Sequence, residues 1–182
     1  VTIGIYQVGT NNLQTIKTLY LNGGSASLVP LGDPCYTPNP NIVRIEEGVY
    51  SGLGSVSLPN FAMGYYLHYE TCCRNGLIDN LATPTNDGIS IFAIIPDPSI
   101  GQNSTPDFGD YPNDAYFCVN NIKYFTWPVT DPDGDSLVFS LVAPLNDGTN
   151  PNNGNSAPGS GAYPFYPSCN FAAGYNQFNV IG

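Results

Sequence analysis

The sequence predicts an all-β protein with tandem immunoglobulin-like β-sandwich domains. Short runs of β-branched and aromatic residues recur along the chain, and clusters of Gly, Pro, Asn and Asp separate them. No segment keeps a 3.6-residue period over the roughly ten positions that a helix needs. These observations together favour two packed sheets.

The expected strands follow one another at short intervals, each bounded by turn residues such as NGG, TPNPN, PTNDG or DPDGD. In order, they are VTIGIY (1–6), TIKTLYL (15–21), ASLVPL (26–31), NIVRI (41–45), SVSLP (55–59), GYYLHYE (64–70), ISIFAII (89–95), AYFCV (115–119), KYFTWPV (123–129) and SLVFSLV (136–142). In the run KYFTWPV, alternation predicts that Trp127 faces a core.

A linker is expected at DPSIGQNSTP (97–106), where Pro, Gly and small polar residues follow an apolar strand. It predicts one β-sandwich domain at 1–98 and an immunoglobulin-like domain at 99–182. The second domain is expected to be incomplete, because its last stretch, GYNQFNVIG, ends without a closing strand. We expect open β edges at both chain ends to pair with further chain or with another copy. Residues 146–161, rich in Asn, Gly, Ser and Pro, are expected to form an exposed loop.

Charge and composition indicate an extracellular protein. The 182 residues include 14 Asp and Glu against 4 Lys and Arg, and Gly, Pro and Tyr are abundant, as in exported β proteins. A net charge of -10 argues against nucleic acid and anionic membranes as partners. The longest clean apolar run, 91–95, is far shorter than the roughly 20 residues of a membrane-spanning helix, so no membrane span is expected.

The cysteines predict disulfides in an oxidising compartment. There is no CxxC pair, and His68 is the only histidine, which argues against zinc. Because side chains alternate between faces in a strand, adjacent cysteines in the extended run are expected to have separate partners. One cysteine is left unpaired or bonded outside the chain, and the residues alone do not choose the connectivity. The five candidates are Cys35, Cys72, Cys73, Cys118 and Cys169.

The segment TDPDGDSLVFSL (130–141) is the candidate metal site. Asp131, Asp133 and Asp135 alternate with Pro and Gly ahead of a strand, and hard carboxylate oxygens in a tight loop suit Ca²⁺. The spacing is not that of an EF-hand. An equally weighted alternative is a plain turn whose carboxylates accept hydrogen bonds from backbone N–H groups. Three further carboxylates are candidate additional ligands: Asp107, Asp110 and Asp114.

No catalytic constellation stands out. The motif GxSxG is absent, and a serine triad would have to use His68, which we interpret as a packing residue. Glu46 and Glu47 are adjacent, so on a strand they face opposite sides and cannot flank one glycosidic bond. The alternating tyrosines of 64–70 are interpreted as packing residues, with an aromatic sugar-binding platform as the alternative.

Several motifs resemble the repeat regions of very large secreted surface proteins of Bacteroidota, the gliding-motility-associated, adhesin-like proteins exported by the type IX route. They occur in the same order: CCRNG (72–76), NSTP (103–106), Cys118-Val-Asn, DPDGDSLVFSL (131–141) and GYNQ (174–177). The resemblance spans nearly the whole chain from about Cys35 onward. Val142 departs from it, because such repeats often carry a cysteine in that strand.

The resemblance implies a non-enzymatic, structural or adhesive module of a cell-surface protein or filament. Disulfides are expected to stabilise this module, and Ca²⁺ at residues 131–135 is a candidate for making it rigid. Its partners would be copies of itself or neighbouring repeats in a linear array. The alternative is a carbohydrate- or protein-binding module on such an array, with surface glycans as ligands. The resemblance also makes a bridge from Cys35 to Cys72 or Cys73 attractive. Ser136 matches the O-glycosylation pattern of this bacterial group, and Asn103 begins an N-glycosylation sequon.

Overall fold

The structure, a computed structural model, describes residues 1–29, 45–52, 54–109, 118, 120–124, 126–147 and 167–179. In these ranges the regular elements are antiparallel strands and two three-residue 3₁₀ turns, so the all-β prediction is confirmed. None of the helical turns in these ranges is long or apolar enough to cross a membrane.

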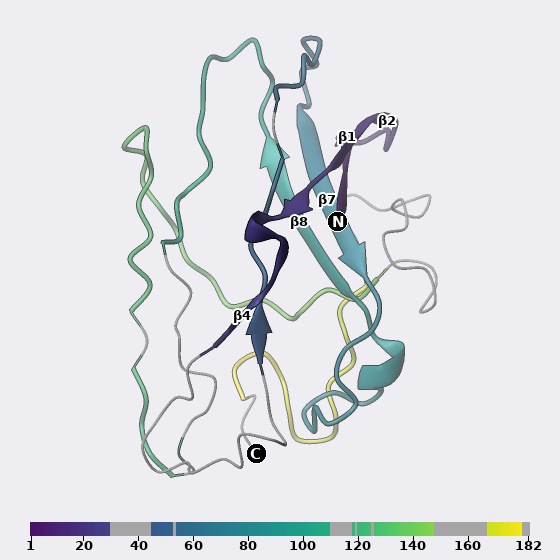
Figure 1. The fold of residues 1–182 in the computed structure, drawn as a ribbon, viewed down its shortest axis with the longest axis vertical. Coiled ribbons are helices and arrows are strands. Elements are labelled where there is room, and N and C mark those ends of the chain that lie inside the picture. The colour runs from purple at the N-terminus through teal and green to yellow at the C-terminus, as the bar shows by residue number, and fades with distance from the viewer. Residues whose placement is uncertain are drawn as a thin grey trace. The chain divides into compact units, whose positions relative to one another are not determined.

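A four-stranded antiparallel sheet is the main element, with strand order β2-β1-β7-β8 (Figure 1). Its strands are β1 (Thr2–Gln7), β2 (Leu13–Thr18), β7 (Tyr65–Thr71) and β8 (Ile89–Ile95). The β7–β8 register is regular from Tyr65↔Ile95 to Thr71↔Ile89, whereas β1–β2 shifts by one residue between Ile5 and Tyr6. The first strand was expected to be an open edge; instead it pairs on both sides, and β2 and β8 are the edges.

Two short ladders complete the assigned strands. The strands β3 (Tyr20–Leu21) and β6 (Tyr50–Ser51) pair, as do β4 (Ser27–Leu28) and β5 (Glu46–Glu47). The 3₁₀ turns are η1 (Asn22–Gly24) and η2 (Pro84–Asn86). In η1, Gly23 has φ of 68°, a left-handed conformation that glycine adopts without steric cost.

The core of the main sheet lies at its centre. Tyr65 and Tyr66 are 0% exposed, and the Tyr6 ring stacks on that of Tyr66 at 5.4 Å between centroids. The Tyr65 hydroxyl donates to the Pro59 carbonyl at 2.6 Å, and the Tyr66 hydroxyl donates to Asn11 Oδ1 at 2.9 Å. Adjacent residues of β7 are therefore buried on both faces, which fits the packing interpretation of these tyrosines rather than an exposed platform.

Three predicted strands carry no strand assignment in the described residues: 55–59, 123–129 apart from residue 125, and 136–142. In the last of these, Phe139 and Leu141 are 66% and 69% exposed. Trp127, expected in a core, is 51% exposed. Local alternation specifies which residues would share a face, but a strand also needs a partner, and none is assigned to these runs among the described residues.

The contacts divide the chain differently from the predicted boundary at 98/99. One unit comprises residues 1–19, 52–102 and 139–182, and the other comprises 20–51 and 103–138. The reason is long-range pairing. Residues far along the chain hydrogen-bond within the first unit, as in the bridge Leu81↔Phe171 and the bond from Ala82 N to Asn170 O. The composition of a linker does not show that a later segment of the chain pairs with an earlier one.

Candidate functional site

The end of the β7–β8 hairpin forms a distinctive corner at the CCR motif. The regular register ends at Thr71↔Ile89, and the next backbone bond runs from Arg74 N to Asp87 O at 2.9 Å. Two cysteines on one strand therefore lie opposite Gly88 alone on the other, which is the two-against-one count of a β-bulge. We call this region, with its neighbours Asn146, Asp147 and Cys169, the cysteine corner.

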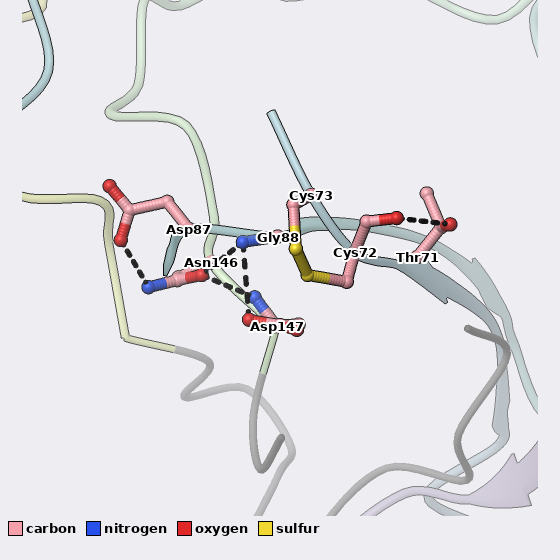
Figure 2. Close-up of a disulfide and its surroundings, with 7 residues drawn as sticks. All are labelled: Thr71, Cys72, Cys73, Asp87, Gly88, Asn146 and Asp147. Atoms are coloured by element: carbon pink, nitrogen blue, oxygen red, sulfur yellow. Dashed lines mark hydrogen bonds between the residues drawn. A yellow bond between two sulfur atoms is a disulfide. The ribbon is translucent and has the colours of Figure 1, made fainter. Parts of the chain in front are cut away.

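Cys72 and Cys73 are bonded to one another in the corner (Figure 2). Their Cα atoms are 3.1 Å apart and the peptide bond between them is cis. This pairing differs from the expectation of separate partners, which assumed that strand alternation continued through both residues, whereas β7 ends at Thr71. The bridge expected from Cys35 involves a residue outside the described ranges and stays a prediction.

The other two described cysteines differ. Cys118 is disulfide-bonded. Cys169 is a free thiol and is 3% exposed. Burial raises the pKa of the Cys169 thiol above its ordinary value, although the guanidinium of Arg74, which hydrogen-bonds to it, acts in the opposite direction.

A polar network surrounds Gly88 in the corner (Figure 2). Asn146 Nδ2 donates to Asp87 Oδ1 at 2.8 Å, while Asn146 Oδ1 accepts from the backbone N–H groups of Gly88 at 2.6 Å and Asp147 at 2.8 Å. A Cβ atom at Gly88 would overlap the Asp147 carboxyl group, so only glycine fits there without rearrangement. Residues 146 and 147 were expected in an exposed loop, but they are half-buried, and their side chains accept hydrogen bonds from the backbone N–H of Gly88.

Arg74 extends this network toward the later part of the chain. Its Nη2 donates to the Leu145 carbonyl at 3.0 Å. Asp87 is 3% exposed, and its Oδ2 is buried without a hydrogen-bond partner, as is Arg74 Nε. The cysteine corner therefore holds a carboxyl group, of Asp87, and a guanidinium group, of Arg74, whose hydrogen-bonding capacity is only partly used.

His68 lies inside the main sheet. Its Nε2 is 2.9 Å from Ser90 Oγ and 3.9 Å from Glu70 Oε2, and all three residues are at most 7% exposed. Burial lowers the pKa of His68 from 6.5 to about 4, so at neutral pH the imidazole is uncharged and its approach to Glu70 is not an ion pair. In a serine triad the carboxylate binds the other ring nitrogen. The geometry fits a packed core network.

The three aspartates of the candidate metal site form a turn. Asp131 Oδ1 accepts from the backbone N–H of Asp133 at 2.8 Å and of Asp135 at 3.3 Å, and Asp133 Oδ2 accepts from Ser104 N. Among the described residues no group of three or more His, Cys, Asp or Glu side chains is arranged to hold a metal ion. The hydrogen bonds of these side chains are those of the plain-turn alternative. Ca²⁺ binding remains a prediction.

The additional carboxylates contribute little to that turn in the described ranges. Asp107 pairs with Thr130 in a β-bridge, and its Oδ1 accepts from Gly109 N at 2.9 Å. Asp110 and Asp114 lie outside the described residues. The glycosylation candidates Ser136 and Asn103 are both exposed, and their modification stays a prediction.

Comparison with protein families, with curated proteins and with solved structures finds no match. The sequence pointed to Cys72 and Cys73 but missed Asp87, Asn146 and Asp147. Their only signal was the pair of turn motifs NDG at 86–88 and 146–148, which gave no indication that the two turns meet.

A cavity of about 180 Å³ lies beside β1, on the face that carries Ile3 and Ile5. It is lined by Ile3, Ile5, Leu67 and Val56 with Lys17 at its side. Typical small-molecule pockets measure roughly 300–1,000 Å³. We therefore do not assign it a ligand.

Proposed function

We propose that the chain is a structural, adhesive module of an extracellular surface protein or filament, built from immunoglobulin-like sandwiches, in which exposed strand edges pair with copies of the same protein. The observation that carries this proposal is the edge strand β8. It is seven residues long, wholly uncharged and apolar apart from one serine, and Ile91 and Ile94 are 59% and 51% exposed.

The register specifies how this edge is presented. Ser90 N donates to Leu145 O at 3.4 Å, so the main-chain groups of Ser90 point away from β7. Because the β7–β8 register is regular, Ile94, four residues later, turns its N–H and C=O the same way. A long apolar edge with exposed β-branched side chains is the kind of surface that accepts an added strand.

The absence of charge on β8 allows a second copy to pair there despite the acidity of the chain. The chain carries a net charge of -10, so two copies repel one another over most of their surfaces. Residues 88–96 contain no charged residue, and an antiparallel pairing of two β8 strands opposes no carboxylates within the strand. Such main-chain pairing, repeated through neighbouring domains, would support a linear array.

The alternative of a carbohydrate-binding module is not favoured by the exposed tyrosines of the β3–β6 ladder. Tyr20 and Tyr50 are 71% and 44% exposed and lie on paired strands. However, Tyr20 is opposite Ser51 and Tyr50 is opposite Leu21, so the two rings face opposite sides of the ladder.

The test is self-association of the full chain by sedimentation velocity. The variant Ile94→Lys should shift the distribution toward monomer, because a charge on an edge strand opposes pairing. Ile16→Lys is the matched control, since Ile16 is 56% exposed on β2, the other edge. Wild-type protein that stays monomeric at all concentrations, or equal effects of both variants, would contradict pairing through β8.

A further inference from the structure

Cys169 and Asn146 share one face of a short ladder. Leu145 and Ser168 form a β-bridge, Asn146 N donates to Pro167 O at 2.8 Å, and Cys169 N donates to Pro144 O at 2.8 Å. Because side chains alternate along each strand, the neighbours of the bridged pair point to the opposite face from Leu145 and Ser168. The Cys169 and Asn146 side chains therefore project together.

That face is turned toward the end of β7. The Asn146 side chain reaches Asp87 and Gly88, and Gly88 lies opposite the Cys72–Cys73 pair (Figure 2). The Cys169 thiol hydrogen-bonds to the side chain of Arg74, the residue directly after Cys73. Cysteines from two distant parts of the chain thus meet in one corner, where Cys72 and Cys73 are bonded and Cys169 is a thiol.

We propose that Cys169 exchanges with the Cys72–Cys73 disulfide, so that the corner interconverts between two disulfide arrangements. The Cys169 thiol loses its proton and the resulting thiolate attacks one sulfur of the pair. A new bond forms from Cys169 to that sulfur, the Cys72–Cys73 bond breaks, and the displaced sulfur leaves as a thiolate that takes up a proton. The number of disulfides is unchanged, and no external oxidant is needed.

Because the Cys169 thiol is buried, we expect it to react with a disulfide of the same protein rather than with a dissolved molecule. Cys169 is 3% exposed, so dissolved thiols and disulfides have little access to it. Cys73 is exposed and Cys72 is half-buried, so the sulfur displaced by the exchange can reach solvent. The arrangement with Cys169 bridged would tie residues 167–179 covalently to the end of β7, whereas the Cys72–Cys73 arrangement leaves the two joined by hydrogen bonds alone. This inference is independent of the proposed assembly through β8.

The experiment is disulfide mapping of the full, oxidised chain. Samples incubated at pH 8 are denatured in N-ethylmaleimide, digested without reduction and analysed by mass spectrometry. We expect two populations. One has an internal 72–73 disulfide and alkylated Cys169, and the other has a peptide containing Cys169 linked to the peptide containing Cys72 and Cys73. The ratio should reach the same value from either starting population.

Three variants sharpen the test. Cys169→Ser should retain only the internal 72–73 disulfide. Cys72→Ser and Cys73→Ser each remove one sulfur of the pair, and in at least one of them Cys169 should become protected from alkylation. Complete alkylation of Cys169 in the wild type and in both single variants would overturn the proposal. So would a bridge from Cys169 to Cys35 or Cys118.

Discussion

Replacing Asn146 by alanine is the sharpest test of the corner, because one amide makes three hydrogen bonds there. Its Nδ2 donates to the carboxylate of Asp87, and its Oδ1 accepts from the N–H groups of Gly88 and Asp147. Asp87 is 3% exposed and its second oxygen already lacks a partner. The variant would remove the hydrogen bond from Asn146 Nδ2 to this carboxylate. Because Asp87 is buried, water cannot readily replace the lost bond.

The expected cost follows from these bonds. A hydrogen bond to a charged group contributes about 1.5–3 kcal/mol, and a buried group left unsatisfied costs about 1–3 kcal/mol. We therefore expect Asn146→Ala to lower the free energy of unfolding by about 3 kcal/mol. For a chain of this length, that corresponds to a decrease of roughly 6–12 °C in the melting temperature. Calorimetry of the full chain measures it.

The matched control is Asn103→Ala. Asn103 is also an asparagine in an irregular segment, but it is exposed, and its amide donates to the carbonyl of the next residue at 2.9 Å. Its replacement should change stability by less than about 0.5 kcal/mol. In a double-mutant cycle, Asp87→Ala and Asn146→Ala should be clearly non-additive. Equal melting temperatures for Asn146→Ala and wild type would refute the corner as described, and would fit the exposed loop that the sequence predicted.

Three further predictions concern pH, metal and modification. Burial lowers the pKa of His68 from 6.5 to about 4, so as the pH falls the unfolded chain binds a proton before the folded chain does. The contribution of His68 to the free energy of unfolding should therefore be constant above about pH 6.5 and fall by about 3 kcal/mol toward pH 4. Urea titrations should show a shallower fall for His68→Gln. If Ca²⁺ binds at residues 131–135, chelator should lower the melting temperature of the transition that includes them, whereas superimposable calorimetric curves would favour the plain turn. Glycosylation at Ser136 or Asn103 should add mass to the chain isolated from its natural source, and an intact mass equal to that of the sequence would exclude it.

The strands of the main sheet were the predictable part of the fold. The runs VTIGIY, GYYLHYE and ISIFAII all became members of this sheet, because alternating or continuous apolar residues of this kind suit paired strands. The run SLVFSLV has the same local pattern but carries no strand assignment. Periodicity specifies which side chains share a face, whereas the existence of a partner strand is a property of the whole chain.

The corner was the unpredictable part. Adjacent cysteines identified its location, but their chemistry depended on where β7 ends, and strand ends are the least reliable boundaries in a sequence. Its polar residues come from the turns at 86–88 and 146–147, which are 58 or more residues apart. Each turn is locally unremarkable, and only tertiary pairing brings the Asn146 amide to the Asp87 carboxylate.

The chain already uses internally the kind of edge closure that we propose between copies. At the first part of β8, the carbonyl of Leu145 accepts from Ser90 N, and the same carbonyl accepts from the Arg74 guanidinium. A distant segment therefore closes the edge beside the cysteine corner. From Ile91 to Ile94 the side chains are exposed, although the strand continues in register. An added strand that continued this closure along β8 would extend an existing set of main-chain bonds, as in strand addition to an exposed sheet edge.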